Sequence, residues 1–318
     1  MKILIADKFS EIYIQQLKDA GLEIIYNPKL GEKDLPEAAK DVDCLVVRST
    51  IVNAETIEKS EKLNLIIRAG AGVNNIDIQA ASKKGIAVSN CPGKNAIAVA
   101  ELTIGLMISL DRRIPHNVLD FKQGKWNKGE YSNAQGIFGK TLAIIGYGNI
   151  GKEVAKRAKA FGMNIYAKDI IKIEDEGVKE FSEFEEVLPI ADIISVHLPA
   201  TPETKNLFNE KLFGLMKNGA IFINTSRADV VDEEALIKAV KEKNLRVGLD
   251  VFKGEPEEKT GAVSSKLQEL DNVYVTHHIG ASTEQAQNAV AEETVKIILS
   301  YIKDGKVINC VNRIGNSV

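Results

Sequence analysis

The sequence is poor in cysteine and aromatic residues, and it carries little excess charge of either sign. Its 318 residues include three cysteines, and aromatic side chains make up 6% of the chain. Cys44, Cys91 and Cys310 are odd in number and far apart, which is typical neither of a disulfide framework nor of a metal cluster. We therefore expect a reducing, cytoplasmic setting and no bound metal.

Charge and hydropathy argue against two further classes of protein. The 41 Lys and Arg residues face 44 Asp and Glu residues, so the chain lacks the basic excess that non-specific binding to nucleic acid requires. The long apolar stretch at 96–110 is interrupted by Glu101 and is shorter than the ~20 residues of a membrane-spanning helix. The first apolar run ends at Asp7 after four residues, too few for a signal peptide. We expect neither a nucleic-acid partner nor a membrane partner.

The chain instead contains two series of short apolar runs that alternate with helical patterns. This alternation predicts an α/β fold of two doubly wound parallel sheets, in line with a length sufficient for about two domains. The predicted strands are 2–6, 22–26, 43–48, 65–68 and 86–89 in the first series and 141–145, 165–167, 193–196, 220–224, 247–251 and 273–276 in the second. A buried helix is predicted over 94–112, ending before Pro115, and a last helix over 283–301 is expected to return to the first domain.

A glycine motif follows the first strand of the second series. The residues GYGNIG at 146–151 run from an apolar strand into a helix, which is the context of a dinucleotide-binding turn. Gly146 permits the tight turn, Gly148 lets a pyrophosphate approach the backbone, and Gly151 permits close packing of helix on strand. The residues predicted to contact the cofactor here are Gly146, Gly148, Asn149, Ile150 and Gly151.

The end of the next strand predicts which cofactor is bound. Asp169 lies 23 residues after Gly146, where a carboxylate binds the adenosine ribose and repels the 2′-phosphate of NADP. We therefore predict NAD, although the adjacent Lys168 is a cation that could tolerate the extra phosphate.

Reactive side chains gather at the predicted carboxyl ends of the second series, where open α/β sheets bind their ligands. They are His197, Arg227, Asp250, His277 and His278, with Glu255 on the loop after the fifth strand. A hydride carrier needs a group that moves a proton, and histidine titrates in the right range. Glu255 could orient a histidine and Arg227 could clamp a carboxylate. These residues alone leave open which of the adjacent histidines is catalytic; His116 is expected at the surface.

Several stretches together resemble one known family. They are VVRST at 46–50, IRAGAGVNNID at 67–77, GYGNIG at 146–151, HLPAT at 197–201, INTSRA at 223–228, LDVF at 249–252 with Glu255-Pro256, and HIG at 278–280. With these motifs the sequence resembles the D-isomer-specific 2-hydroxyacid dehydrogenases over nearly its whole length. The departures from the family pattern are Ala228-Asp229, where Gly-Gly is commoner, and His277, where proline is usual.

The resemblance implies both a fold and a catalytic set. A Rossmann-type NAD-binding domain at 95–282 would be inserted into a discontinuous, flavodoxin-like substrate domain at 1–94 and 283–318, with catalysis in the cleft between them. Arg227 would bind the substrate carboxylate, and Glu255 would support His278 as the acid/base. Further cofactor contacts are implied for His197, Thr201, Thr225, Ser226 and Asp250, and further substrate contacts for Ala71, Gly72 and Val73.

The resemblance also implies partners. Members commonly form homodimers through the cofactor domain, and the segment 124–126 with Trp126 is expected at that interface. Longer members continue into a regulatory domain, so feedback through such a domain is not expected here.

Substrate identity depends mainly on two arginines. Arg48 and Arg68 each follow an apolar strand of the first domain, and a phosphorylated 2-hydroxy acid needs such cations. Reductases of glyoxylate or hydroxypyruvate and D-lactate dehydrogenases would carry the same catalytic set, so these substrates stay open. A corepressor that senses NADH and a methyltransferase are alternatives of another class; binding of NADH rather than S-adenosylmethionine would separate them.

Overall fold

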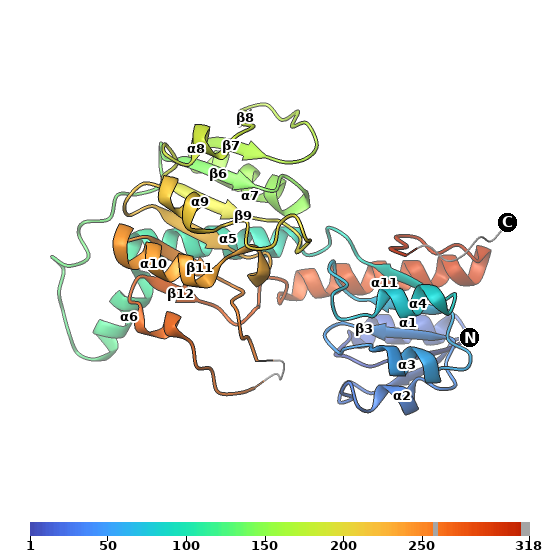
Figure 1. The fold of residues 1–318 in the computed structure, drawn as a ribbon. Helices are drawn as coiled ribbons and strands as arrows, with labels where there is room; N and C mark the ends of the chain where they lie inside the picture. The colour runs from blue at the N-terminus through green and yellow to red at the C-terminus, as the bar shows by residue number, and fades with distance from the viewer. Residues whose placement is uncertain (257–259, 313–318) are drawn as a thin grey trace. The chain divides into compact units, whose positions relative to one another are not determined.

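The computed structural model describes residues 1–256 and 260–312 and divides the chain into two compact units (Figure 1). Unit 1 consists of Met1–Asn95 and Ser282–Val318, and unit 2 consists of Ala96–Ala281. The division expected at 94 and 283 differs from this by one residue at each junction. Each unit is described by itself.

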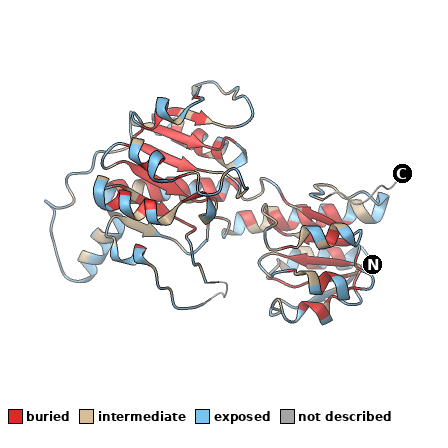
Figure 2. Ribbon diagram, in the orientation of Figure 1, coloured by how far each residue is buried: buried red, intermediate tan, exposed pale blue. Residues whose placement is uncertain are grey.

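Unit 1 contains a five-stranded sheet in which every strand pair is parallel. Its strands are β1 (Lys2–Ile5), β2 (Glu23–Tyr26), β3 (Cys44–Val47), β4 (Leu65–Arg68) and β5 (Ala87–Asn90), in the order β2-β1-β3-β4-β5. This is the flavodoxin-like order. The central strands of this sheet are buried, as Figure 2 shows. Strands that are buried on both faces need continuous apolar sequence, and the Val/Ile/Leu-rich runs supply it.

Successive side chains of β1 explain how both faces are covered. Ile3 and Ile5 pack with α1 (Glu11–Asp19) and α11 (Glu284–Asp304), whereas Leu4 faces the opposite layer. That layer contains α2 (Leu35–Ala38), α3 (Ala54–Lys59) and α4 (Ile78–Lys83). The last helix of the chain is therefore part of the first unit, which is discontinuous in sequence.

Unit 2 contains a seven-stranded parallel sheet in the order β12-β11-β10-β9-β6-β7-β8. Its strands are β6 (Thr141–Ile145), β7 (Asn164–Lys168), β8 (Val178–Glu180), β9 (Ile193–Val196), β10 (Ile221–Asn224), β11 (Arg246–Leu249) and β12 (Val273–Val275). Counted from β6, this is the Rossmann order 3-2-1-4-5-6 with a seventh strand added. The six-strand expectation missed β8, because a three-residue edge strand of sequence VKE has no apolar run.

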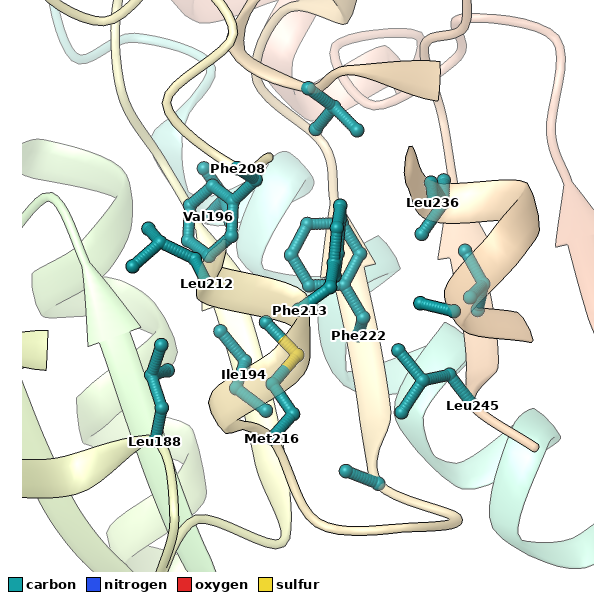
Figure 3. Close-up of a cluster of buried hydrophobic side chains, with 14 of the residues drawn as sticks. Leu188, Ile194, Val196, Phe208, Leu212, Phe213, Met216, Phe222, Leu236 and Leu245 are labelled. Carbon is teal, nitrogen blue, oxygen red and sulfur yellow. The ribbon is translucent and has the colours of Figure 1, made fainter. Parts of the chain in front are cut away.

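Helices cover both faces of this sheet. α5 (Ala96–Arg112) and α7 (Asn149–Ala160) pack on one face, and α8 (Phe184–Val187), α9 (Glu210–Leu215) and α10 (Glu233–Lys243) pack on the other. Two short 3₁₀ helices, η1 (Ala228–Val230) and η2 (Lys266–Glu269), complete the unit. Figure 3 shows the core on the α9–α10 face, where the rings of Phe208 and Phe213 lie 5.1 and 5.2 Å from that of Phe222.

The predicted helix end at Arg112 is confirmed, but Pro115 does not cause it. α5 ends at Arg112, Arg113 adopts a left-handed φ of 52°, and Pro115 lies in the first turn of a further helix, α6 (Ile114–Lys122). Proline suits that position because the first helical N–H groups have no partner within the helix. Among residues 1–256 and 260–312 we find neither a helix long and apolar enough to cross a bilayer nor a metal-binding cluster of acidic, histidine or cysteine side chains.

Candidate active site

The side chains predicted for chemistry in unit 2 follow strands at one edge of the sheet. His197 follows β9, Arg227 lies three residues beyond β10, Asp250 follows β11, and His278 lies on the turn after β12. Because all strand pairs in this sheet are parallel, the carboxyl ends of these strands lie at the same edge. The expected gathering of reactive groups is therefore present in the structure.

His278 and Glu255 form a direct pair. The Nδ1 atom of His278 lies 2.8 Å from Oε2 of Glu255, whose other oxygen accepts the backbone N–H of Phe252 at 2.9 Å. A carboxylate can only accept, so Nδ1 carries the proton and Nε2 is the nitrogen left for substrate. The side chain of His278 is 57% exposed, so this nitrogen is accessible in unit 2. The pair distinguishes His278 from the neighbouring exposed His277.

Asp250 holds the turn that presents His278. Its Oδ1 accepts the Thr276 hydroxyl at 2.6 Å and the Ile279 N–H at 2.9 Å, and its Oδ2 accepts the Gly280 N–H at 2.8 Å. Within this turn His278 has a left-handed φ of 51°, a backbone conformation that few non-glycine residues adopt. The buried Asp250 carboxylate thus holds the Thr276 side chain before His278 and the backbone after it, a function that the sequence analysis did not foresee.

Asn224 was missed as a functional residue, and it shapes the turn that carries Arg227. Its Oδ1 accepts the N–H and the hydroxyl of Ser226 at 2.9 and 2.7 Å, and its Nδ2 donates to the Arg227 carbonyl at 2.9 Å. The hydroxyl of Thr225 lies 3.0 Å from that of Thr103 on α5. A buried asparagine at the end of an otherwise apolar strand was the signal that could have identified it.

Arg227 is partly buried and electrostatically linked to Glu255. Burial lowers the pKa of the guanidinium, and the negative charge of Glu255 acts in the opposite direction. Its Nη1 donates to the Ser226 carbonyl at 2.7 Å. An arginine remains charged under these conditions and still has donors to bind a carboxylate.

The glycine loop has the close approaches that its motif predicts. A Cβ atom on Gly151 would overlap the Gly146 carbonyl oxygen, and one on Gly146 would lie 2.5 Å from the His197 carbonyl oxygen. At Gly148 a Cβ would meet no protein atom within 4 Å. Asn149 and Ile150 form the first turn of α7, whose free N–H groups favour an anion. The space beside Gly148 thus fits a pyrophosphate.

A cavity of about 560 Å³ adjoins this loop and is lined by Gly148 and Asp169, among others. The Asp169 Oδ2 accepts the Tyr147 N–H at 2.5 Å and its Oδ1 accepts the Ile170 N–H at 2.7 Å, which leaves lone pairs for ribose hydroxyls. Lys168 does not line this cavity: its Nζ donates to the Ser182 carbonyl and lies 5.7 Å from the ring centre of Phe184. These residues fit the adenosine half of NAD.

His197 and Thr201 follow β9, next to the glycine-loop strand β6. His197 Nε2 lies 2.8 Å from the Ser195 hydroxyl, whereas its buried Nδ1 has no hydrogen-bond partner among the residues described. Burial lowers the pKa of His197 to about 3, so its ring is neutral. Thr201 begins a short turn in which its N–H donates to the Thr204 hydroxyl at 2.9 Å.

The predicted substrate residues of the first domain all lie in unit 1. Arg68 is the last residue of β4 and pairs in register with Val47 of β3, so Arg48 and Arg68 lie at the same edge of neighbouring strands. The Asp7 carboxylate fixes the loop that carries Arg48, since its Oδ2 accepts the N–H groups of residues 48–50 at 2.7 to 3.0 Å. The segment 71–73 follows Arg68 and is held by a 2.5 Å hydrogen bond from Asn90 to the Ala71 carbonyl.

Comparisons with known proteins identify the family of the chain. Residues 104–280 match the family described as D-isomer specific 2-hydroxyacid dehydrogenase, NAD binding domain. The chain is 43% identical to a D-3-phosphoglycerate dehydrogenase of Methanocaldococcus jannaschii, over 98% of this chain and 60% of that protein. It is 46% identical to a hydroxypyruvate reductase of Thermotoga maritima, over 86% of this chain and 89% of that one.

A solved structure has a similar fold over nearly the whole length of the chain. The NAD⁺-bound 3-phosphoglycerate dehydrogenase of Entamoeba histolytica superposes with a TM-score of 0.83 at 32% identity, covering 99% of each chain. The present chain spans about 60% of the length of the Methanocaldococcus protein that it matches. The family match, the seven-stranded Rossmann sheet and the glycine loop place this chain among the D-isomer specific 2-hydroxyacid dehydrogenases, with their NAD-binding domain in unit 2.

Proposed function

We propose that the chain is an NAD-dependent dehydrogenase that oxidises D-3-phosphoglycerate to 3-phosphohydroxypyruvate, the first step of L-serine biosynthesis. The observation that carries the proposal is the 2.8 Å pair of His278 and Glu255 at the same sheet edge as Arg227. The names of the relatives from Methanocaldococcus and Entamoeba support the choice of a phosphorylated substrate.

The roles of the chain's own residues follow from their donors and acceptors. Glu255 holds Nδ1 of His278 as a donor, so Nε2 takes the proton of the substrate 2-hydroxyl during oxidation and returns it during reduction. Arg227 binds the substrate carboxylate and thereby fixes the position of C2. NAD, when bound, supplies the acceptor for the hydride that leaves C2.

Arg48 and Arg68 are assigned to the substrate phosphate. Their place at the ends of neighbouring strands of unit 1 puts two guanidinium groups on one sheet edge. Two planar cations are suited to bidentate contacts with phosphate oxygens.

The test is an NADH-oxidation assay with 3-phosphohydroxypyruvate, hydroxypyruvate, glyoxylate and pyruvate, repeated with NADPH. We expect kcat/KM for the phosphorylated substrate to exceed the others at least about tenfold, since a charged hydrogen bond contributes about 1.5–3 kcal/mol. Arg48→Gln and Arg68→Gln should each lower kcat/KM for the phosphorylated substrate about 10- to 100-fold and leave kcat/KM for hydroxypyruvate unchanged. Arg112→Gln, at an exposed helix end, is the control.

A second candidate is reduction of hydroxypyruvate or glyoxylate. The 46% identity to the Thermotoga reductase, over 89% of that protein, favours it. Preference for an unphosphorylated keto acid, with no response to the Arg48 and Arg68 variants, would support this function and contradict the phosphoglycerate assignment. Turnover of none of the four substrates would contradict both and favour an NADH-sensing binding protein.

We also propose a homodimer formed through unit 2. α6 contains no buried residue, and large apolar side chains on it and on the following segment are exposed. They are Ile114, Val118, Leu119, Phe121, Trp126 and Phe138. A second copy of the chain would cover them, as exposed apolar patches of this kind mark interaction sites. All three cysteines lie in the described residues and are free, which supports a cytoplasmic location.

A further inference from the structure

Tyr147, the second residue of the glycine motif, connects two separate points of the loop that follows β7. Its backbone N–H donates to the Asp169 Oδ2 at 2.5 Å, and its hydroxyl donates to the Asp175 Oδ2 at 2.6 Å. The residue is 4% exposed and packs in the core beneath α5 and α7. Tyr147 thus holds the start of the loop 169–175 through its backbone and the end of the loop through its side chain.

Lys159 of α7 completes this attachment. Its Nζ lies 2.5 Å from the Asp175 Oδ1 and 2.5 Å from the Glu176 carbonyl oxygen. Hydrogen bonds from Lys159 and Tyr147 lower the pKa of Asp175, so this carboxylate is ionised near neutral pH. Burial and the adjacent Asp175 raise the pKa of Tyr147, so the phenol keeps the proton that it donates.

The attached loop forms much of the wall of the 560 Å³ cavity described above. Residues 171–176 line it together with Tyr147 and Gly148 of the glycine loop, Lys152 of α7 and Asp169. Gly148 is assigned to the pyrophosphate and Asp169 to the adenosine ribose, so the loop encloses the part of the site that takes the adenosine half of a dinucleotide.

We propose that the Tyr147–Asp175 hydrogen bond is a latch that shapes the adenosine subsite, and that both are positioning residues for cofactor affinity. This inference rests on the proposed function, since it presumes a dinucleotide in the cavity. The latch lies beside β6 and β7, whereas His278 follows β12 at the far side of the sheet order. It should therefore act on binding of the adenosine half and leave the chemical step unchanged.

Tyr147→Phe tests the latch because it removes the hydroxyl and keeps the ring in the core. We expect the Kd values of NADH and of AMP to rise together by about tenfold, the loss expected for a hydrogen bond to a charged group. The Kd of nicotinamide mononucleotide should stay within twofold, and kcat at saturating NADH should stay within twofold while KM for NADH rises. Calorimetric titration and steady-state kinetics measure these quantities.

Tyr166→Phe is the matched control. Tyr166 lies on β7, is also partly buried, and its hydroxyl has only a 3.5 Å contact with Lys179 among the described residues. Its variant should bind AMP as the unmodified chain does. Asp175→Asn changes the acceptor of the same hydrogen bond and leaves the buried core unchanged. Asp175→Asn also removes the charge that pairs with Lys159, so its effect should be the larger one. Combined with Tyr147→Phe, it should raise the AMP Kd no further than Asp175→Asn alone, because both variants act on the same Tyr147–Asp175 hydrogen bond.

Three results separate the possibilities. An AMP Kd within twofold of the unmodified chain in both single variants overturns the latch. Equal weakening of AMP and nicotinamide mononucleotide also overturns it, since that reports a general loss of structure. If the unmodified chain binds neither NADH nor AMP, the proposed function fails together with this inference. If it binds both and neither variant changes their Kd values, only the latch is refuted.

Discussion

Two histidines at the carboxyl edge of the unit 2 sheet have opposite surroundings. His278 is exposed and paired with a carboxylate, whereas His197 has a buried Nδ1, and its Nε2 contacts the Ser195 hydroxyl. A carboxylate stabilises an imidazolium, and an uncharged buried pocket disfavours it. The same residue type is therefore suited to proton transfer at one position and stays neutral at the other.

Replacing His278 by alanine removes the proposed acid/base. We expect kcat to fall about 10²- to 10⁴-fold while the Kd of NADH changes little, because general acid–base catalysis contributes that much and the ring lies outside the glycine loop. His277→Ala, at the exposed neighbouring position, should retain activity. A parallel collapse of NADH binding in His278→Ala would show that the residue is structural.

His197 should make the stability of the protein depend on pH. Its folded pKa of about 3 lies below the ordinary value of 6.5, so the unfolded chain takes up a proton that the folded chain does not as the pH falls below 6.5. The free energy of unfolding should therefore decrease on acidification by up to about 1.4 kcal/mol per pH unit from this residue.

His197→Asn should remove that part of the pH dependence. Urea denaturation of both proteins at pH 7, 6 and 5 measures the difference in their free energies of unfolding, which should shift steadily in favour of the variant towards pH 5. A difference that is constant over this range would contradict a neutral His197 ring.

At the scale of the element, the glycine loop and α7 contain two glycines that we expect to differ in function, one needed for stability and the other for cofactor binding. A Cβ on Gly151 would collide with the Gly146 carbonyl, whereas a Cβ on Gly148 would meet no protein atom within 4 Å. The φ of Gly148, −74°, is also open to other residues. The two glycines thus serve different purposes, packing at Gly151 and ligand access at Gly148.

Alanine at these two positions should give different outcomes. Gly148→Ala should leave the melting temperature within about 2 °C and weaken NADH binding at least about tenfold, because the added methyl occupies space assigned to the pyrophosphate. Gly151→Ala should lower both stability and NADH affinity, because helix and strand must move apart. Scanning calorimetry and NADH titration measure the two effects; normal NADH affinity in Gly148→Ala would contradict the placement of the pyrophosphate.

At the scale of the whole molecule, the exposed apolar side chains of α6 and the following segment predict association. Phe121 is 69% exposed and Trp126 is 83% exposed. Light scattering should give a mass of twice the 34.7 kDa chain. Phe121→Glu combined with Trp126→Glu should halve that mass, because a buried unpaired carboxylate at an interface is strongly unfavourable.

The control for association is Ile12→Glu. Ile12 is 78% exposed on α1 of unit 1 and is not one of the apolar residues proposed to form the interface, so its variant should keep the mass of the unmodified protein. A single-chain mass for the unmodified protein at micromolar concentration would contradict the homodimer.

The sequence by itself determined the two parallel sheets and the strand ends at which reactive groups gather. Strands such as β4 and β6 were predicted to the residue, because runs buried on both faces are continuously apolar and glycine marks the turn that follows. β8 and α6 were not predicted, since a three-residue edge strand and a helix without a buried face carry little or no apolar periodicity.

Tertiary structure decided which side chains act together. The resemblance to the family implied that Glu255 supports His278, but the residues alone did not distinguish His278 from His277. The fold does so, because it brings Glu255, 23 residues earlier, within 2.8 Å of His278. Asn224 and Tyr147 are ordinary polar residues in the sequence, and Asp250 was predicted there to contact the cofactor. In the structure their hydrogen bonds hold the loops that follow β10, β7 and β12. The local sequence pattern shows whether a segment is buried. Which side chain hydrogen-bonds with which depends instead on how strands and loops far apart in the sequence come together in the fold.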